Sequence, residues 1–146
     1  MVHCLLCPQN CHLAPERTGV CRVRQRQGDK LYTLNYGRLT SLALDPIEKK
    51  PLYHFHPGSA ILSAGTLGCN LACGFCQNWQ ISQADAPSDF VTPAGLVAIA
   101  EREREAGNIG LAYTYSEPGV WWEYLRDTAP LAREPVYCVR GTLTTR

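Results

Sequence analysis

Seven of the eight cysteines fall into two clusters, and this arrangement is typical of metal ligands rather than of disulfide scaffolds. Cysteine thiolates bind zinc and iron–sulfur clusters. In a reducing compartment, clustered cysteines indicate a metal site or catalysis more often than disulfides. The three-Cys loop contains Cys69, Cys73 and Cys76, the four-Cys segment contains Cys4, Cys7, Cys11 and Cys21, and Cys138 stands alone.

The three-Cys loop provides fewer ligands than a closed metal site needs. Structural zinc has four protein ligands, whereas catalytic zinc has three and a water. No Cys or His lies between Cys76 and Cys138, and the nearest upstream His is His56. Three thiolates around a four-iron cluster leave one iron free to bind another molecule. A three-Cys zinc or structural site is the alternative.

The segments after residue 58 predict alternating strands and helices. Ala60–Ala64 is expected to be a short buried strand, followed by irregular chain that carries the three-Cys loop. Thr92 and Pro93 predict a helix start, with Thr92 as the N-cap, and Gly107 ends this helix. The next elements are expected to be a strand over Ile109–Tyr115, a helix from about Val120 into Ala129–Arg133, and a third strand over Pro135–Val139. This rhythm is typical of a parallel sheet or barrel.

The first 57 residues form a separate predicted region. Leu31–Tyr36 and Leu39–Leu44 are rich in strand-forming residues, and Gly37 between them predicts a two-stranded unit. Asp45–Gly58 contains three prolines and is expected to be an irregular connector. We therefore expect a Cys-rich extension and connector over residues 1–57 and a strand–helix region over 58–146.

Charge and composition exclude several function classes. The chain has 146 residues and a formal net charge of +1, which offers no general attraction to nucleic acid or to a membrane surface. It has no apolar run long enough for a transmembrane helix, and the N-terminus has no signal-peptide pattern. We therefore expect a cytoplasmic protein without nucleic-acid or membrane partners.

The spacing C-x3-C-x-aromatic-C, with Phe75 as the aromatic residue, resembles the signature of the radical S-adenosylmethionine (radical SAM) superfamily. Further segments resemble the AmmeMemoRadiSam-system branch, which is similar to pyruvate formate-lyase activating enzymes. The resemblance covers about Cys4 to Arg133. The segments are Asp45–Phe55, Pro57–Ser59, Gly68–Asn70, Cys76–Trp79 and Tyr113–Pro118.

This resemblance implies a 4Fe–4S cluster on Cys69, Cys73 and Cys76, whose open iron binds S-adenosylmethionine (SAM). A one-electron donor would drive reductive cleavage of SAM to methionine and a 5′-deoxyadenosyl radical, an oxidoreductase-type reaction. Phe75 would lie beside the adenine, and Glu117 would contact the SAM amino group. The alternative for Glu117 is a cap on the following helix. Similarity to activating enzymes suggests a protein or peptide substrate, by analogy alone.

The four-Cys segment has enough thiolates for a closed tetrahedral site. Its spacing does not identify the metal, so zinc and a second iron–sulfur cluster both stay open. Lys49 and Lys50 could also bind a substrate carboxylate.

The resemblance implies an α/β fold, a partial parallel (β/α) radical SAM barrel preceded by the Cys-rich extension. The family pattern stops after Arg133, so we expect the N-terminal part of a longer enzyme, truncated or frame-shifted. The alternatives are a non-catalytic zinc or iron–sulfur binding module and an inactive truncated copy.

Overall fold

The N-terminal region consists of two small antiparallel hairpins in the computed structural model, which describes residues 1–132. The predicted third strand over Pro135–Val139 lies outside these residues. The four-Cys segment occupies the first hairpin and the chain leading to the second. The hairpins pair β1 (Val2–His3) with β2 (His12–Leu13), and β3 (Arg24–Gln27) with β4 (Lys30–Thr33).

The predicted pairing of Leu31–Tyr36 with Leu39–Leu44 is wrong. Gly28 and Asp29 form a two-residue loop that joins β3 to β4, and Gly28 has a φ of +58°. A tight turn of this kind favours pairing between its two flanking strands. The segment around Leu39 instead forms β5 (Arg38–Pro46), a strand of the main sheet.

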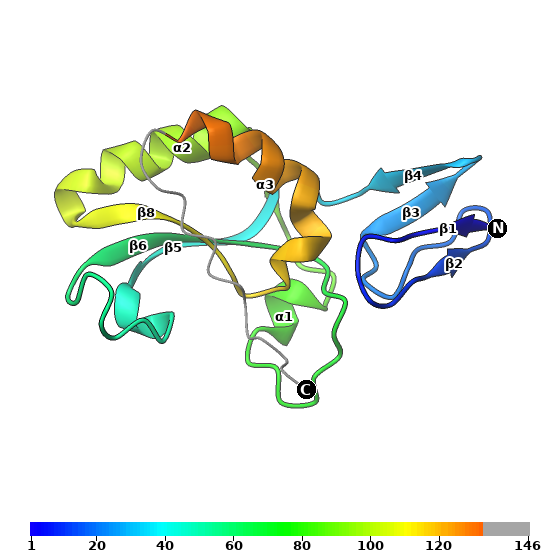
Figure 1. Ribbon diagram of the computed structural model, residues 1–146, viewed down its shortest axis with the longest axis horizontal. Helices are drawn as coiled ribbons and strands as arrows, with labels where there is room; N and C mark the ends of the chain where they lie inside the picture. The colour runs from blue at the N-terminus through cyan, green and yellow to red at the C-terminus, as the bar shows by residue number, and fades with distance from the viewer. Residues whose placement is uncertain (133–146) are drawn as a thin grey trace.

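The main sheet has four strands in the order β7-β5-β6-β8 (Figure 1). β6 (Ala60–Thr66) pairs antiparallel with β5 along most of its length, and parallel with β8 (Asn108–Tyr113). The short β7 (Asp89–Phe90) pairs with the start of β5. The sheet is therefore open and mixed, and residues 1–132 form no closed barrel. It also spans the predicted boundary between residues 57 and 58.

One helix connects the two parallel strands, as the sequence predicts. α2 (Pro93–Arg102) begins at the predicted N-cap, where Thr92 Oγ1 accepts a hydrogen bond of 3.1 Å from the Gly95 amide. A 3-10 turn over Glu103–Ala106 follows, and Gly107 ends the helix in the left-handed conformation. The strand–helix–strand unit of β6, α2 and β8 is thus confirmed.

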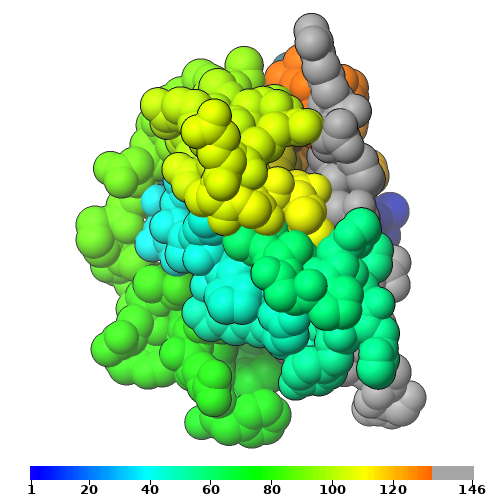
Figure 2. Space-filling view, turned by 90° about the vertical axis from the view of Figure 1, so that its left-hand side faces the viewer, coloured from blue at the N-terminus to red at the C-terminus, as the bar shows by residue number. Residues whose placement is uncertain are grey.

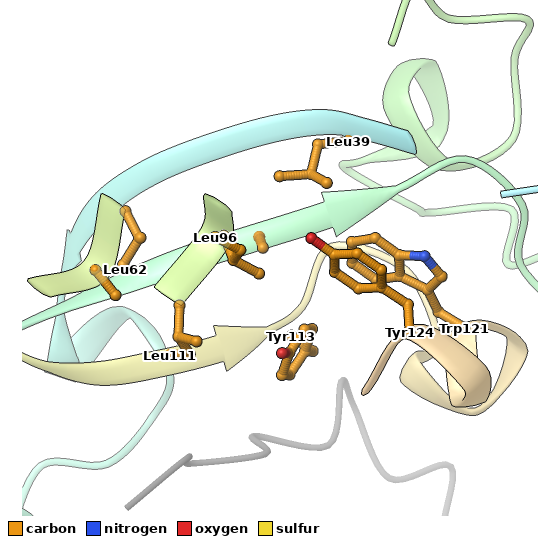
Figure 3. Packing of buried hydrophobic residues seen from close by; sticks show 9 residues of the cluster. Leu39, Leu62, Leu96, Leu111, Tyr113, Trp121 and Tyr124 are labelled. Carbon is orange, nitrogen blue, oxygen red and sulfur yellow. The ribbon is translucent and has the colours of Figure 1, made fainter. Parts of the chain in front are cut away.

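The main core lies between the sheet and the helices that cover one of its faces (Figures 1 and 3). The chain after β8 passes through a 3-10 turn (Pro118–Trp121), α3 (Trp122–Thr128) and a second turn (Ala129–Leu131). The Trp121 and Tyr124 rings stack with centroids 4.5 Å apart. The largest buried members of this core are Leu39, Leu62, Leu96, Leu111, Tyr113, Trp121 and Tyr124.

The predicted connector packs against the opposite face of the sheet. A 3-10 turn over Ile47–Lys49 buries Ile47 fully, in a small cluster with Ile61 and Ala112. The connector leads into β6, whose first amide, that of Ala60, donates to the Gly107 carbonyl at 3.0 Å. Seen from this end of the molecule, the connector lies directly beneath the end of α2 and the start of β8 (Figure 2).

The chain between β6 and α2 contains a helix that the sequence analysis did not predict. α1 (Trp79–Ser82) is a single turn, in which the Asn78 carbonyl accepts bonds from the Ser82 amide and the Ser82 hydroxyl. One turn is too short to give an apolar repeat, so periodicity could not reveal it. In the described part of the chain, no helix is long and apolar enough to cross a membrane.

Candidate functional site

The three-Cys loop and the turn that carries Glu117 leave the same edge of the sheet. The three-Cys loop follows the end of β6 at Thr66, and the Glu117 turn follows the end of β8 at Tyr113. β6 and β8 are parallel neighbours, with Ala64 paired to Tyr113. Ligands of open α/β sheets bind at this carboxyl edge.

The three cysteines differ in how far they are enclosed. All three are free cysteines, of which Cys69 is buried and Cys73 and Cys76 are half-buried. The Cys76 amide donates to the Cys73 carbonyl at 3.2 Å, which makes a turn between these two ligands. In the described conformation no group of three or more Cys, His, Asp or Glu side chains converges within residues 1–132 to hold a metal ion. The donor types and their place at the carboxyl edge fit a cluster site, but the sulfurs are not gathered.

The hairpin region packs directly against the start of the three-Cys loop. Gly68 has a φ of +85°, and a Cβ atom there would lie 2.5 Å from Val23 Cγ1. Two side chains add hydrogen bonds to loop carbonyls: Gln9 to Asn70 at 2.9 Å, and Asn35 to Leu67 at 3.3 Å. The N-terminal region therefore forms one wall against which this loop rests.

The four-Cys segment lies in that same region. Cys4 and Cys21 are buried, Cys7 and Cys11 are half-buried, and the Cys4 amide donates to the Cys11 carbonyl at 2.9 Å. Burial raises the pKa of the Cys21 thiol. As for the three-Cys loop, the sulfurs do not converge in the described conformation.

A partly buried ion pair fixes the hairpin region to the helices. Arg24 donates to both carboxylate oxygens of Glu123, at 2.6 and 2.9 Å, across 99 residues of sequence. The Arg24 side chain is only 8% exposed. Burial opposes ionisation of Glu123, but the bonds from Arg24 outweigh it and lower the pKa of this carboxyl. Arg24 lies in the basic stretch Arg17–Lys30, whose sequence is equally typical of a solvated surface. The bonds to Glu123 show that Arg24 has a structural role.

The two residues expected beside SAM occupy different settings. Phe75 lies in the three-Cys loop and is 88% exposed. Glu117 is half-buried and is the N-cap residue of the turn Pro118–Trp121. Within the described chain its side chain makes no capping hydrogen bond to that turn.

The structure adds a buried network that the sequence analysis missed. The Asp45 carboxylate accepts hydrogen bonds from Lys49 at 2.8 Å, from Lys50 at 2.6 Å and from the Tyr115 hydroxyl. The Lys50 ammonium also lies 4.8 Å from the centroid of the Tyr115 ring. Both lysines thus bind Asp45, and Lys50 is buried, so their predicted role in binding a substrate carboxylate is not what this conformation shows.

The network shifts the pKa values of Asp45 and Tyr115 in opposite directions. Burial opposes the charge on Asp45, but hydrogen bonds from Lys49, Lys50, Tyr115 and Ser63 outweigh it and hold the pKa of Asp45 well below its usual range. Burial and the Asp45 carboxylate raise the pKa of Tyr115 to about 12. Tyr115 is therefore a neutral donor at physiological pH. No spacing rule could have linked Asp45 to a tyrosine 70 residues later.

Comparison with known proteins gives one informative similarity. No family model matches the chain, and no solved structure matches it. Uncharacterized protein MJ0808 of Methanocaldococcus jannaschii is 42% identical over 136 residues, covering 91% of this chain and 40% of that protein. This chain therefore spans less than half the length of the relative it matches.

Proposed function

We propose that this chain carries the cluster-binding part of a radical SAM enzyme, with a 4Fe–4S cluster on Cys69, Cys73 and Cys76 and with SAM held beside it. The observation that carries the proposal is the shared edge of β6 and β8, from which the three-Cys loop and the Glu117 turn both leave. A cluster and a carboxylate at one sheet edge could together hold the amino-acid end of one SAM molecule.

The donor set suits a cluster with an open iron. Cys69, Cys73 and Cys76 would ligate three irons and leave the fourth for the amino and carboxylate groups of SAM. When bound, the cluster and SAM would supply a 5′-deoxyadenosyl radical that abstracts hydrogen from a substrate. This chain's own residues would anchor the loop, contact SAM and cover the site.

The three-Cys loop has room to close around a cluster. Cys73, Gly74 and Cys76 lie in irregular chain, and a Cβ atom on Gly74 would have no neighbour within 4 Å. Cys69, by contrast, is buried beside the tightly packed Gly68. Binding of a metal commonly completes the folding of its ligand loop. We therefore expect Cys73 and Cys76 to move toward Cys69 when the cluster binds.

Three further side chains support a ligand at this edge. Asn70, next to Cys69, has a buried Oδ1 atom with no hydrogen-bond partner within residues 1–132. Leaving a buried acceptor unpaired is costly, so a donor from a bound ligand would stabilise the loop. The exposed ring of Phe75 is available to pack on adenine. The carboxylate of Glu117 is suited to accept a hydrogen bond from an N–H of the SAM amino group.

We also propose the four-Cys segment as a second metal site, for zinc or another iron–sulfur cluster. Its contact with the three-Cys loop through Val23 and Gly68 would let a metal there stiffen the wall of the site. A protein or peptide substrate is proposed only by analogy with activating enzymes.

Anaerobic reconstitution with iron and sulfide tests the proposal. We expect reconstituted protein to bind four irons on the three-Cys loop (plus any bound by the four-Cys segment) and, after reduction, to cleave SAM to methionine and 5′-deoxyadenosine. Cys76→Ala should lose this cluster and SAM cleavage together. Cys138→Ala, which removes a cysteine outside both clusters, is the matched control. Retention of SAM cleavage by Cys76→Ala would show that Cys76 is not a cluster ligand, whereas binding of zinc without iron would favour a non-catalytic metal-binding module.

A further inference from the structure

Tyr115 has a backbone conformation that aromatic residues rarely adopt. Its φ is +67°, in the left-handed region. A bulky side chain is strained there, and such strain persists only where surrounding contacts impose it. Strained residues of this kind cluster at functional sites. Tyr115 lies two residues before Glu117, on the turn that leaves the carboxyl end of β8.

The contacts that impose this conformation come from β5 and β6. The side chain of Tyr115 folds back over β6, where a Cβ atom on Gly65 would lie 2.8 Å from Tyr115 Cδ2. Its hydroxyl donates to Asp45, whose other partners are Lys49 and Lys50. Gly65 thus provides the space, and Asp45 provides the anchor at the end of the ring.

The Asp45 anchor is itself held firmly. Asp45 is 4% exposed and lies on β5 opposite Ile61 of β6. The 3-10 turn over Ile47–Lys49 returns the chain so that Lys50 Nζ reaches Asp45 Oδ2 at 2.6 Å. The same ammonium faces the Tyr115 ring, so one cation contacts both halves of the Asp45–Tyr115 pair. Movement of the connector and movement of Tyr115 are therefore coupled.

The backbone pairing between β8 and β6 stops just before this turn. The last paired residues are Tyr113 and Ala64, and the Thr114 amide donates to the Ala64 carbonyl at 2.9 Å. Beyond Thr114, the side chain of Tyr115 supplies the attachment to the sheet. The direction in which the chain continues to Glu117 consequently depends on the conformation of Tyr115.

We infer that Asp45, Lys50 and Tyr115 are positioning residues for SAM: they hold the turn after β8 so that the Glu117 carboxylate faces the three-Cys loop. The inference rests on the proposed function, because that function assigns the SAM amino group to Glu117. It gives Asp45 and Lys50 of the connector a role in positioning Glu117, in addition to the cluster-binding role proposed for the cysteines.

Hydrogen exchange of the turn is the first test, and it needs neither cluster nor SAM. In Tyr115→Phe, which keeps the ring and removes the hydroxyl, we expect amides of residues 114–117 to exchange about tenfold faster than in the wild type, the effect of losing one hydrogen bond to a charged group. Asp45→Asn should have at least this effect, because it also weakens the bonds from Lys49 and Lys50. Tyr53→Phe, which alters an exposed tyrosine on the connector, should leave exchange unchanged.

SAM affinity of the reconstituted, reduced protein is the second test. We expect Tyr115→Phe to bind SAM about tenfold more weakly than the wild type at equal iron content, with Tyr53→Phe unchanged. The double variant Asp45→Asn/Tyr115→Phe should bind SAM no more weakly than Asp45→Asn alone, because Asp45→Asn already weakens the bond from Tyr115 as well as those from Lys49 and Lys50. Faster exchange with unaltered SAM affinity would overturn the positioning role. A wild type that does not respond to SAM would instead contradict the proposed function, and the exchange experiment would still decide whether the network holds the turn.

Discussion

Val23 and Gly68 pack so closely that a Cβ atom on Gly68 would lie 2.5 Å from a Val23 methyl carbon. Val23 follows the last cysteine of the four-Cys segment by two residues, and Gly68 immediately precedes the first cysteine of the three-Cys loop. The two cysteine clusters are therefore parts of one packed region, in which the absence of a single side chain permits contact.

Gly68→Ala should separate this contact from simple backbone strain. At Gly68 an alanine would meet Val23 and also adopt a φ of +85°, whereas at Gly107 it would adopt a φ of +87° with no neighbour within 4 Å. We expect Gly107→Ala to lower the free energy of unfolding by about 1 kcal/mol. Gly68→Ala should lower it by about 2–4 kcal/mol, because overpacking adds to the strain. Denaturant unfolding of both variants measures the difference, and equal losses would show that the Val23 contact is unimportant.

Glu123→Gln should loosen the attachment of the hairpin region to the helices. It removes the charge that balances a guanidinium only 8% exposed, so we expect a loss of about 2–3 kcal/mol in the free energy of unfolding. Glu101→Gln makes the same chemical change in the pair with Arg104, where both side chains are more than 40% exposed. That control should cost less than about 1 kcal/mol. Similar losses in the two variants would contradict a structural role for the Arg24–Glu123 pair.

Alkaline pH should weaken the wild type more than Tyr115→Phe. The folded pKa of Tyr115 is raised from 10 to about 12, so its stabilising contribution is fully present below pH 10 and is lost as the pH rises toward 12. Two pKa units correspond to about 2–3 kcal/mol. Unfolding measured between pH 9 and 12 should show this extra loss in the wild type and not in the variant. Parallel curves for the two proteins would mean that Tyr115 does not donate to Asp45.

Acid pH should show the opposite dependence through Asp45. Its pKa is lowered in the folded protein, so its contribution is present above the unfolded value near 4 and is lost as the pH falls through the folded value. Below pH 4 the wild type should lose about 1.4 kcal/mol of stability per pH unit from this group alone. Asp45→Asn lacks this slope in thermal or denaturant unfolding across the same range. A slope that survives the substitution would assign the acid sensitivity to other carboxyls.

Local sequence signals predicted the regular elements that stand close to the site. The apolar run from Ala60 gave β6, and Thr92 and Gly107 marked the two ends of the helical segment. These features depend on neighbours within a few residues, so propensity and capping rules detect them. The parallel arrangement of β6 and β8 followed from the helix between them.

Features that depend on distant residues were not predictable in the same way. Strand propensity identified the segment around Leu39 but not its partner, since a propensity does not specify which strand lies alongside. The contact of Gly68 with Val23 and the bond from Tyr115 to Asp45 join residues far apart in the sequence. Among the contacts of Asp45, the pair with Lys49, four residues later, has a local spacing that could have indicated an ion pair.

Electron paramagnetic resonance of anaerobically reconstituted, reduced protein, recorded with and without SAM and alongside iron and zinc counts, tests the central claim most directly. The account predicts an iron–sulfur signal that shifts when SAM is added, because SAM binds the iron that Cys69, Cys73 and Cys76 leave open. A signal that is indifferent to SAM, or zinc in place of iron, would contradict it.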